Sequence, residues 1–94
     1  MLPVILTATI YADLFEGRMQ ASGVPFHHAE MTVAHRTFPI GCEILVEHRG
    51  VRKWLKVTDR CPRRRVLDMS RASARALRIH GRGMVRVLQM RRKQ

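Results

Sequence analysis

Residues 57–77, VTDRCPRRRVLDMSRASARAL, place two aspartates on either side of three consecutive arginines. Asp59 ends a predicted strand, and Asp68 lies between two apolar residues just before a predicted helix. The two carboxylates are therefore expected to converge at one end of a sheet. The alternative is that both aspartates are surface residues that neutralise Arg63, Arg64 and Arg65.

Residues 70–79 carry a clear helix signal. Ser70 is a favourable N-cap, the alanines that follow favour helix, and Gly81 lies where a helix end is expected. The spacing i, i+4, i+7 places a narrow apolar stripe on one face, with Leu77 beside it. We expect this helix to pack across the mouth of a barrel. The stripe consists of Ala72, Ala76 and Ile79.

The remaining pattern is mainly β. Residues 42–47 and 53–59 flank the turn His48-Arg49-Gly50-Val51 and predict a hairpin, in which Glu43 and Glu47 point outward. Two further strands are expected near the ends of the chain, at residues 7–12 and 84–90. Residues 17–39 show no lasting period and predict long loops with short strands.

The length of 94 residues predicts a single domain, residues 1–94, with a thin core. The first twelve residues are apolar, but they lack a basic leader and are shorter than a membrane-spanning helix. They are interpreted as a strand, so neither a signal peptide nor a transmembrane segment is expected.

The net charge of +11 lies entirely in the last third of the chain, because residues 1–59 carry equal numbers of basic and acidic side chains. One interpretation is that this positive charge attracts a polyanion. The alternative is that it forms a solubilising face without a dedicated partner. Nucleic acid is not expected as the partner, because aromatic residues make up only 5% of the chain and no helix-turn-helix or zinc-finger spacing is present.

The histidines and cysteines offer few further sites. His35, in the stretch TVAHRTFPIG, precedes an aromatic-proline turn and is a candidate acid/base or orienting group. The doublet His27-His28 is more typical of a surface loop. Metal-ligand spacings such as CxxC and HxxxH are absent from the sequence, so no metal or other cofactor is expected.

Five motifs in order resemble the rare lipoprotein A family of bacterial septal lytic transglycosylases, with a weaker likeness to expansins. The motifs are TATIYAD, GRMQASGVPF, TVAHRTFPIG, VTDRCP and VLDMSRASARAL. The resemblance implies a mainly β fold, a six-stranded double-psi β-barrel with one short packed helix. It also implies a groove for peptidoglycan glycan strands and a location in the cell envelope, periplasm or outside the cell. Separately from the resemblance, we expect a monomer.

The resemblance places the family's site positions on His35, Asp59 and Asp68. A lytic transglycosylase uses the sugar's own 6-hydroxyl as nucleophile and forms a 1,6-anhydro product, so one acid/base residue can suffice. We assign that role to Asp68, because its apolar neighbours raise a carboxyl pKa. Asp59 and His35 are expected to position and tune it. The expected substrate-binding residues are Tyr11, Ser22, Arg63, Arg64 and Arg65, with the arginines holding substrate carboxylates.

Two positions depart from the family pattern. Val24 follows the ASG motif where an acidic residue is usual, which leaves open a slower enzyme, a changed substrate or a domain that only binds glycan. Cys61 stands where glycine is usual. Cys42 and Cys61 form a disulfide if their Cα atoms lie within ~7 Å, and are otherwise two buried thiols. A disulfide would support an exported location.

Overall fold

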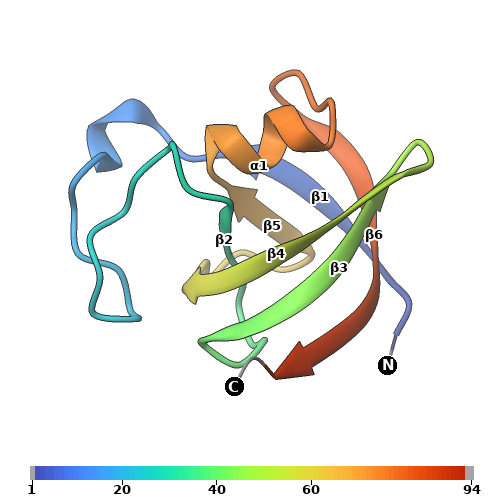
Figure 1. Cartoon of the computed structure of the whole chain (residues 1–94), viewed down its shortest axis with the longest axis horizontal. Helices are drawn as coiled ribbons and strands as arrows, with labels where there is room; N and C mark the ends of the chain where they lie inside the picture. Colours follow the sequence, from blue (N-terminus) through green and yellow to red (C-terminus); the bar gives the residue numbers. More distant parts are fainter. Residues whose placement is uncertain (1, 93–94) are drawn as a thin grey trace.

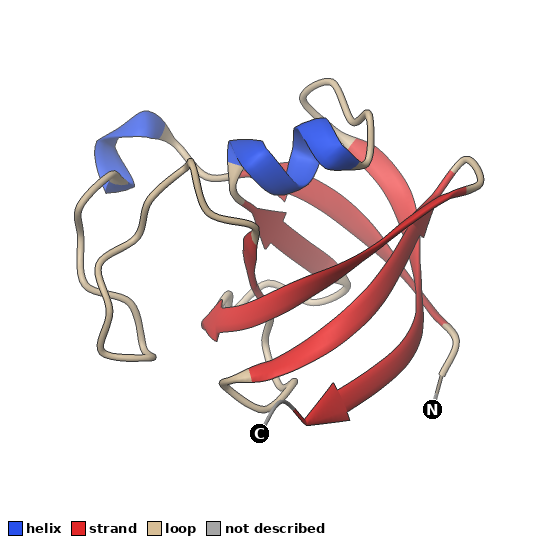
Figure 2. Cartoon of the chain, in the orientation of Figure 1, coloured by secondary structure: helices blue, strands red, loops and turns tan. Residues whose placement is uncertain are grey.

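Six strands close into a β-barrel in the computed structural model, which describes residues 2–92 (Figures 1 and 2). The order around the barrel is β1-β5-β2-β4-β3-β6. This mainly β barrel with one short α-helix confirms the predicted fold class. The elements are β1 (Val4–Ile10), a 3-10 helix η1 (Asp13–Phe15), β2 (Thr32–Ala34), β3 (Cys42–His48), β4 (Val51–Asp59), β5 (Val66–Met69), α1 (Arg71–Ala76) and β6 (Gly83–Arg92).

Two of the strand pairs are parallel, β1 with β5 and β2 with β4. The other four pairs are antiparallel. Parallel neighbours need crossover connections, so segments distant in sequence are brought side by side around the barrel. Closure leaves no unpaired sheet edge. Within residues 2–92 no helix is long and apolar enough to cross a membrane.

The β3–β4 hairpin follows the predicted alternation. Glu43 and Glu47 point away from the core and form ion pairs with arginines of β4 and β6. The turn is tighter than predicted, because only Arg49 and Gly50 separate the strands. Both have left-handed φ angles, 47° and 83°, as a two-residue turn that matches the strand twist requires.

Helix α1 begins after the predicted N-cap, Ser70, but ends at Ala76, earlier than predicted. Of the predicted stripe, Ile79 is buried, but Ala72 and Ala76 are only half-buried. Ser73 and Leu77 are fully buried in their place. The reason is that the Ser73 hydroxyl donates a hydrogen bond to the Thr32 carbonyl, 3.0 Å away, which allows this polar side chain to face β2.

The buried apolar side chains form two clusters. The larger fills the barrel interior, and α1 lies over one end of it (Figure 1). The smaller joins the long segment 11–31 to the barrel and consists of Tyr11, Phe26, Ala34, Cys61 and Val66. Cys42 belongs to the first cluster and Cys61 to the second, and both are free thiols. The structure thus has two buried thiols in place of the possible disulfide.

The Ser70→Ala variant tests the link between α1 and the barrel. The Ser70 hydroxyl accepts a hydrogen bond from the Ser73 backbone N–H at 3.1 Å and donates to the Glu30 carbonyl. Its removal should lower the free energy of unfolding by about 1–2 kcal/mol in urea denaturation. Arg75→Ala, an exposed change on the same helix, should have little effect. Equal stabilities of the two variants would contradict this description.

Candidate active site

The two aspartates of the opening stretch lie on either side of β2. Ala34 of β2 is the register partner of Asp59 on β4 and of Asp68 on β5. Both carboxylates line one cavity of about 370 Å³, together with Tyr11, Phe15 and Arg63. We call this the aspartate cavity. The structure therefore brings together the two acids that the sequence singles out.

Asp68 is half-buried on β5, where it lies between Leu67 and Met69 in sequence. Burial raises its pKa, and the neighbouring Asp59 charge acts in the same direction. A hydrogen bond from the Thr9 hydroxyl, 2.7 Å from Oδ1, and the charge of Arg63 oppose this rise. Asp68 consequently keeps its proton to higher pH than an ordinary aspartate, as a general acid requires.

Asp59 has a donor on each carboxylate oxygen. The Tyr11 hydroxyl donates to Oδ2 at 2.8 Å, and the Ala21 backbone N–H donates to Oδ1 at 2.9 Å. Tyr11 is itself fixed by stacking on Phe26, with ring centroids 4.2 Å apart. Asp59 is thus an oriented carboxylate. Ser22 lies next to the end of β4, because its backbone N–H donates a hydrogen bond to the carbonyl of Thr58. Ser22 is not among the residues that line the aspartate cavity.

The His35 ring lies outside the aspartate cavity. Its backbone N–H donates to the Asp59 carbonyl at 3.1 Å, so the two residues are joined through the main chain. The ring stacks on Phe38, and Nδ1 accepts hydrogen bonds from the backbone N–H groups of Thr37 and Phe38. Burial lowers the pKa of His35, and Arg60 adds to the effect. The ring lines a second cavity, which we call the mouth cavity.

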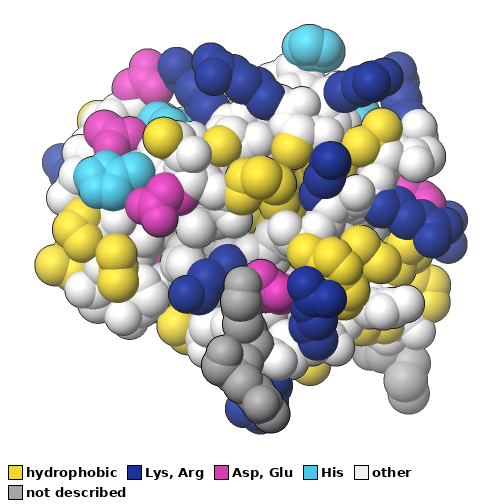
Figure 3. All heavy atoms as spheres, viewed as in Figure 1, with side chains coloured by type: hydrophobic (Ala, Val, Ile, Leu, Met, Phe, Trp, Pro, Cys, Tyr) yellow, Lys and Arg dark blue, Asp and Glu magenta, His cyan; other side chains and the backbone are white. Residues whose placement is uncertain are grey.

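The three consecutive arginines are divided between the two cavities: Arg63 lines the aspartate cavity, and Arg64 and Arg65 line the mouth cavity. Among the described residues, none of the three forms an ion pair with Asp59 or Asp68. Among residues 2–92, the alternative in which the aspartates neutralise these arginines is therefore supported by no ion pair, although the charge of Arg63 acts on Asp68. On the face drawn in Figure 3, Lys and Arg side chains occupy several separate places.

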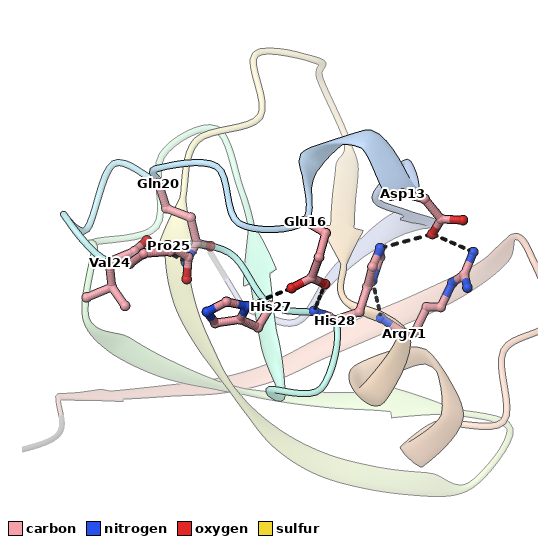
Figure 4. A network of polar contacts seen from close by, with 8 residues as sticks. All are labelled: Asp13, Glu16, Gln20, Val24, Pro25, His27, His28 and Arg71. Atoms are coloured by element: carbon pink, nitrogen blue, oxygen red, sulfur yellow. Dashed lines mark hydrogen bonds and ion pairs between the residues drawn. The ribbon is translucent and has the colours of Figure 1, made fainter.

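A network of polar contacts that the sequence did not predict joins residues 13–28 to one another and to Arg71 of α1 (Figure 4). Glu16 accepts a hydrogen bond from the His28 backbone N–H at 2.9 Å and contacts His27 Nδ1 at 2.6 Å. Asp13 pairs with Arg71 of α1 at 2.7 Å. His28 Nδ1 accepts from the Arg71 backbone N–H. The sequence feature that could have predicted this network is the presence of two acids three residues apart, Asp13 and Glu16, ahead of the His27-His28 doublet.

Comparison with known proteins identifies the family. A closed six-stranded barrel with two parallel and four antiparallel strand pairs and one short helix has the architecture of a double-psi β-barrel. The family model described as "Lytic transglycolase" matches residues 6–89. The chain belongs to this family and is an RlpA-like double-psi β-barrel domain.

Two curated relatives illustrate the match. "Endolytic peptidoglycan transglycosylase RlpA" of Pasteurella multocida is 37% identical over 81 residues, which cover 82% of this chain and 28% of the relative. "Probable endolytic peptidoglycan transglycosylase RlpA" of Aquifex aeolicus is 40% identical over 83 residues, covering 84% of this chain and 34% of the relative. The chain therefore spans only about a third or less of each relative's length.

A solved structure shares the fold. "Streptomyces papain inhibitor (SPI)" superposes with a TM-score of 0.67 and 23% sequence identity, covering 93% of this chain and 94% of that chain. At this identity the likeness shows the architecture alone.

Tyr11 reports directly on the aspartate cavity, because it is the only tyrosine in the chain. Burial and, next, the hydrogen bond to Asp59 raise its pKa well above the usual range. Ultraviolet titration of the folded protein should therefore show no phenolate at pH ~10, where an ordinary tyrosine is half-ionised. Asp59→Asn should lower the midpoint only in part, because burial remains. A midpoint near 10 in protein that circular dichroism shows to be folded would contradict the geometry.

Proposed function

We propose that this domain cleaves the glycan strands of peptidoglycan as a lytic transglycosylase, with Asp68 as its acid/base residue. The observation that carries the proposal is a half-buried carboxyl with a raised pKa in a cavity that it shares with a second, hydrogen-bonded carboxylate. The names of the relatives support the choice of substrate. Because peptidoglycan lies in the cell envelope, the proposal includes a location there.

Asp68 would act twice in one turnover. Its carboxyl protonates the glycosidic oxygen as the bond from that oxygen to the anomeric carbon breaks. The carboxylate then takes the proton of the same sugar's 6-hydroxyl, whose oxygen bonds to the anomeric carbon. The products are a 1,6-anhydro sugar and a shortened strand with a new hydroxyl end. Asp68 regains its proton, and no water is consumed.

Asp59 would stabilise the positive charge that develops at the anomeric carbon. Tyr11 and Ala21 hold its two oxygens, so the negative charge is oriented before the reaction begins. In this proposal His35 positions Asp59 through the main chain rather than transferring a proton. Its ring Nδ1 already accepts two backbone hydrogen bonds.

The proposed contacts to the strand begin with the residues of the aspartate cavity. Tyr11 and Arg63 line it, and Arg63 is exposed, so its guanidinium is available to a substrate oxygen. Ser22 would contact a sugar farther along the strand, because its turn lies next to the end of β4. Arg64 and Arg65 belong to the neighbouring mouth cavity and would contact a substituent of the same strand.

A non-catalytic wall-binding module is the second candidate, and Val24 favours it. This side chain is 53% exposed, in the turn that places the Ala21 N–H on Asp59. The sequence thus presents an apolar group where the family pattern expects an acid. Binding of a glycan would survive that change more readily than acid/base chemistry.

Asp68→Asn separates the two candidates, because the amide keeps the shape of the side chain but cannot exchange a proton. Release of anhydro-sugars from purified sacculi, measured by mass spectrometry, should fall roughly 10² to 10⁴-fold. Sacculus binding and folding should be nearly unchanged. The matched control is Glu47→Gln, an outward carboxyl paired with Arg52 and Arg86, which should release anhydro-sugars at the wild-type rate. Equal rates for Asp68→Asn and Glu47→Gln would remove Asp68 from the chemistry.

Val24→Glu is the complementary test, because it restores the expected acid at an exposed position. A gain in anhydro-sugar release would show that Val24 weakens an enzyme. If wild type and Val24→Glu both bind sacculi but release no anhydro-sugars, where a known transglycosylase does, the enzyme proposal fails and the binding module replaces it.

A further inference from the structure

The mouth cavity has a volume of about 300 Å³ and lies at the end of the barrel opposite α1. Val4 begins β1, and Arg64 and Arg65 directly precede β5, which runs parallel to β1. Helix α1 follows the other end of β5. The cavity is therefore separate from the surface that α1 covers and from the lining of the aspartate cavity.

His35 lines this cavity, and its ring is held in place by hydrogen bonds at Nδ1 and by stacking on Phe38. The residue is 8% exposed, and Nδ1 accepts hydrogen bonds from Thr37 and Phe38 at 3.1 and 3.0 Å. An imidazole that accepts at Nδ1 carries its proton on Nε2 in the neutral form. Within residues 2–92, both hydrogen bonds of the ring are accepted by Nδ1, and none involves Nε2. The lowered pKa keeps the ring neutral near pH 7, with Nε2–H as its remaining donor.

The charged part of the lining is entirely cationic. Arg36, Arg64 and Arg65 line the cavity, and none of them forms an ion pair within residues 2–92. The lining contains no carboxylate, and Val4, Leu6 and Thr37 complete it. Guanidinium groups present planar pairs of donors that match a carboxylate. The cavity is thus suited to a small planar anion.

The two cavities adjoin along the chain. Arg63 lines the aspartate cavity and its neighbour Arg64 lines the mouth cavity. In the same way, the His35 backbone N–H is bonded to the Asp59 carbonyl. A polymer bound at Asp59 and Asp68 can therefore extend a substituent toward His35.

We propose that the mouth cavity is a carboxylate subsite that binds the lactyl carboxylate of a muramic acid unit, with His35 Nε2–H, Arg64 and Arg65 as its donors. The proposal rests on the proposed function for the choice of a glycan strand. It gives the domain a means to distinguish the carboxylate-bearing sugar of the strand from the neutral one.

N-acetylmuramic acid and N-acetylglucosamine form a matched pair of probes, because they differ by the lactyl group. In nuclear magnetic resonance titrations of the full chain, N-acetylmuramic acid should shift the His35 ring signals and the Thr37 and Phe38 amide signals. The shifts should saturate with a dissociation constant on the order of 1–10 mM, as for a single small anion. N-acetylglucosamine should leave these signals in place.

The variant that tests the donors is Arg64→Gln with Arg65→Asn. Asparagine is chosen at position 65 because Arg65 has a left-handed φ of 56°, which asparagine tolerates. Affinity for N-acetylmuramic acid should fall about tenfold or more. The matched control, Arg75→Gln with Arg78→Asn, removes the same charge near the end of α1, and Arg78 has a φ of 57°. Its affinity should equal that of wild type.

Three results would overturn the proposal: equal shifts with both sugars, equal loss of affinity in both double variants, or tighter binding of inorganic phosphate at the same signals. The outcomes also separate this site from the proposed activity. Anhydro-sugar release without a muramic acid effect at His35 would reject the subsite alone. A saturable effect at His35 without anhydro-sugar release would reject the activity alone.

Discussion

The pairing of β2 with both β4 and β5 is the constraint on which the site depends. This strand has only three residues, yet it is parallel to one neighbour and antiparallel to the other. Its Thr32 carbonyl accepts hydrogen bonds from the Ser70 backbone and the Ser73 hydroxyl, which fix it against α1. Because Ala34 stands between Asp59 and Asp68 in register, a shift of β2 would separate the two carboxylates.

The two aspartates differ in environment, and this difference assigns their roles. Asp59 accepts hydrogen bonds from the Tyr11 hydroxyl and from the Ala21 backbone N–H, which fix the orientation of its carboxyl group. Asp68 accepts one hydrogen bond, from Thr9, and burial outweighs it in setting the direction of the pKa shift. Two carboxyl groups whose surroundings differ in this way are suited to divide acid/base and electrostatic work.

Local signals in the sequence predicted the parts of the fold that depend on neighbouring residues. The hairpin alternation placed Glu47 outward, and the Ser70 cap fixed the start of α1. The face of α1 was missed because the burial of Ser73 depends on the Thr32 carbonyl, which is remote in sequence. The convergence of the aspartates was expected from the residues themselves, whereas His35 was grouped with them through the family resemblance, which does not show that His35 lines the mouth cavity.

The central claim is that burial keeps Asp68 protonated at a pH where an ordinary aspartate has ionised. A ¹³C nuclear magnetic resonance titration of the Asp68 carboxyl carbon, assigned with the Asp68→Asn variant, measures this directly. The account predicts a midpoint above the usual value of about 3.9, with a decrease when Asp59→Asn removes the neighbouring charge. A midpoint at or below 3.9 would contradict the assignment of Asp68 as the acid.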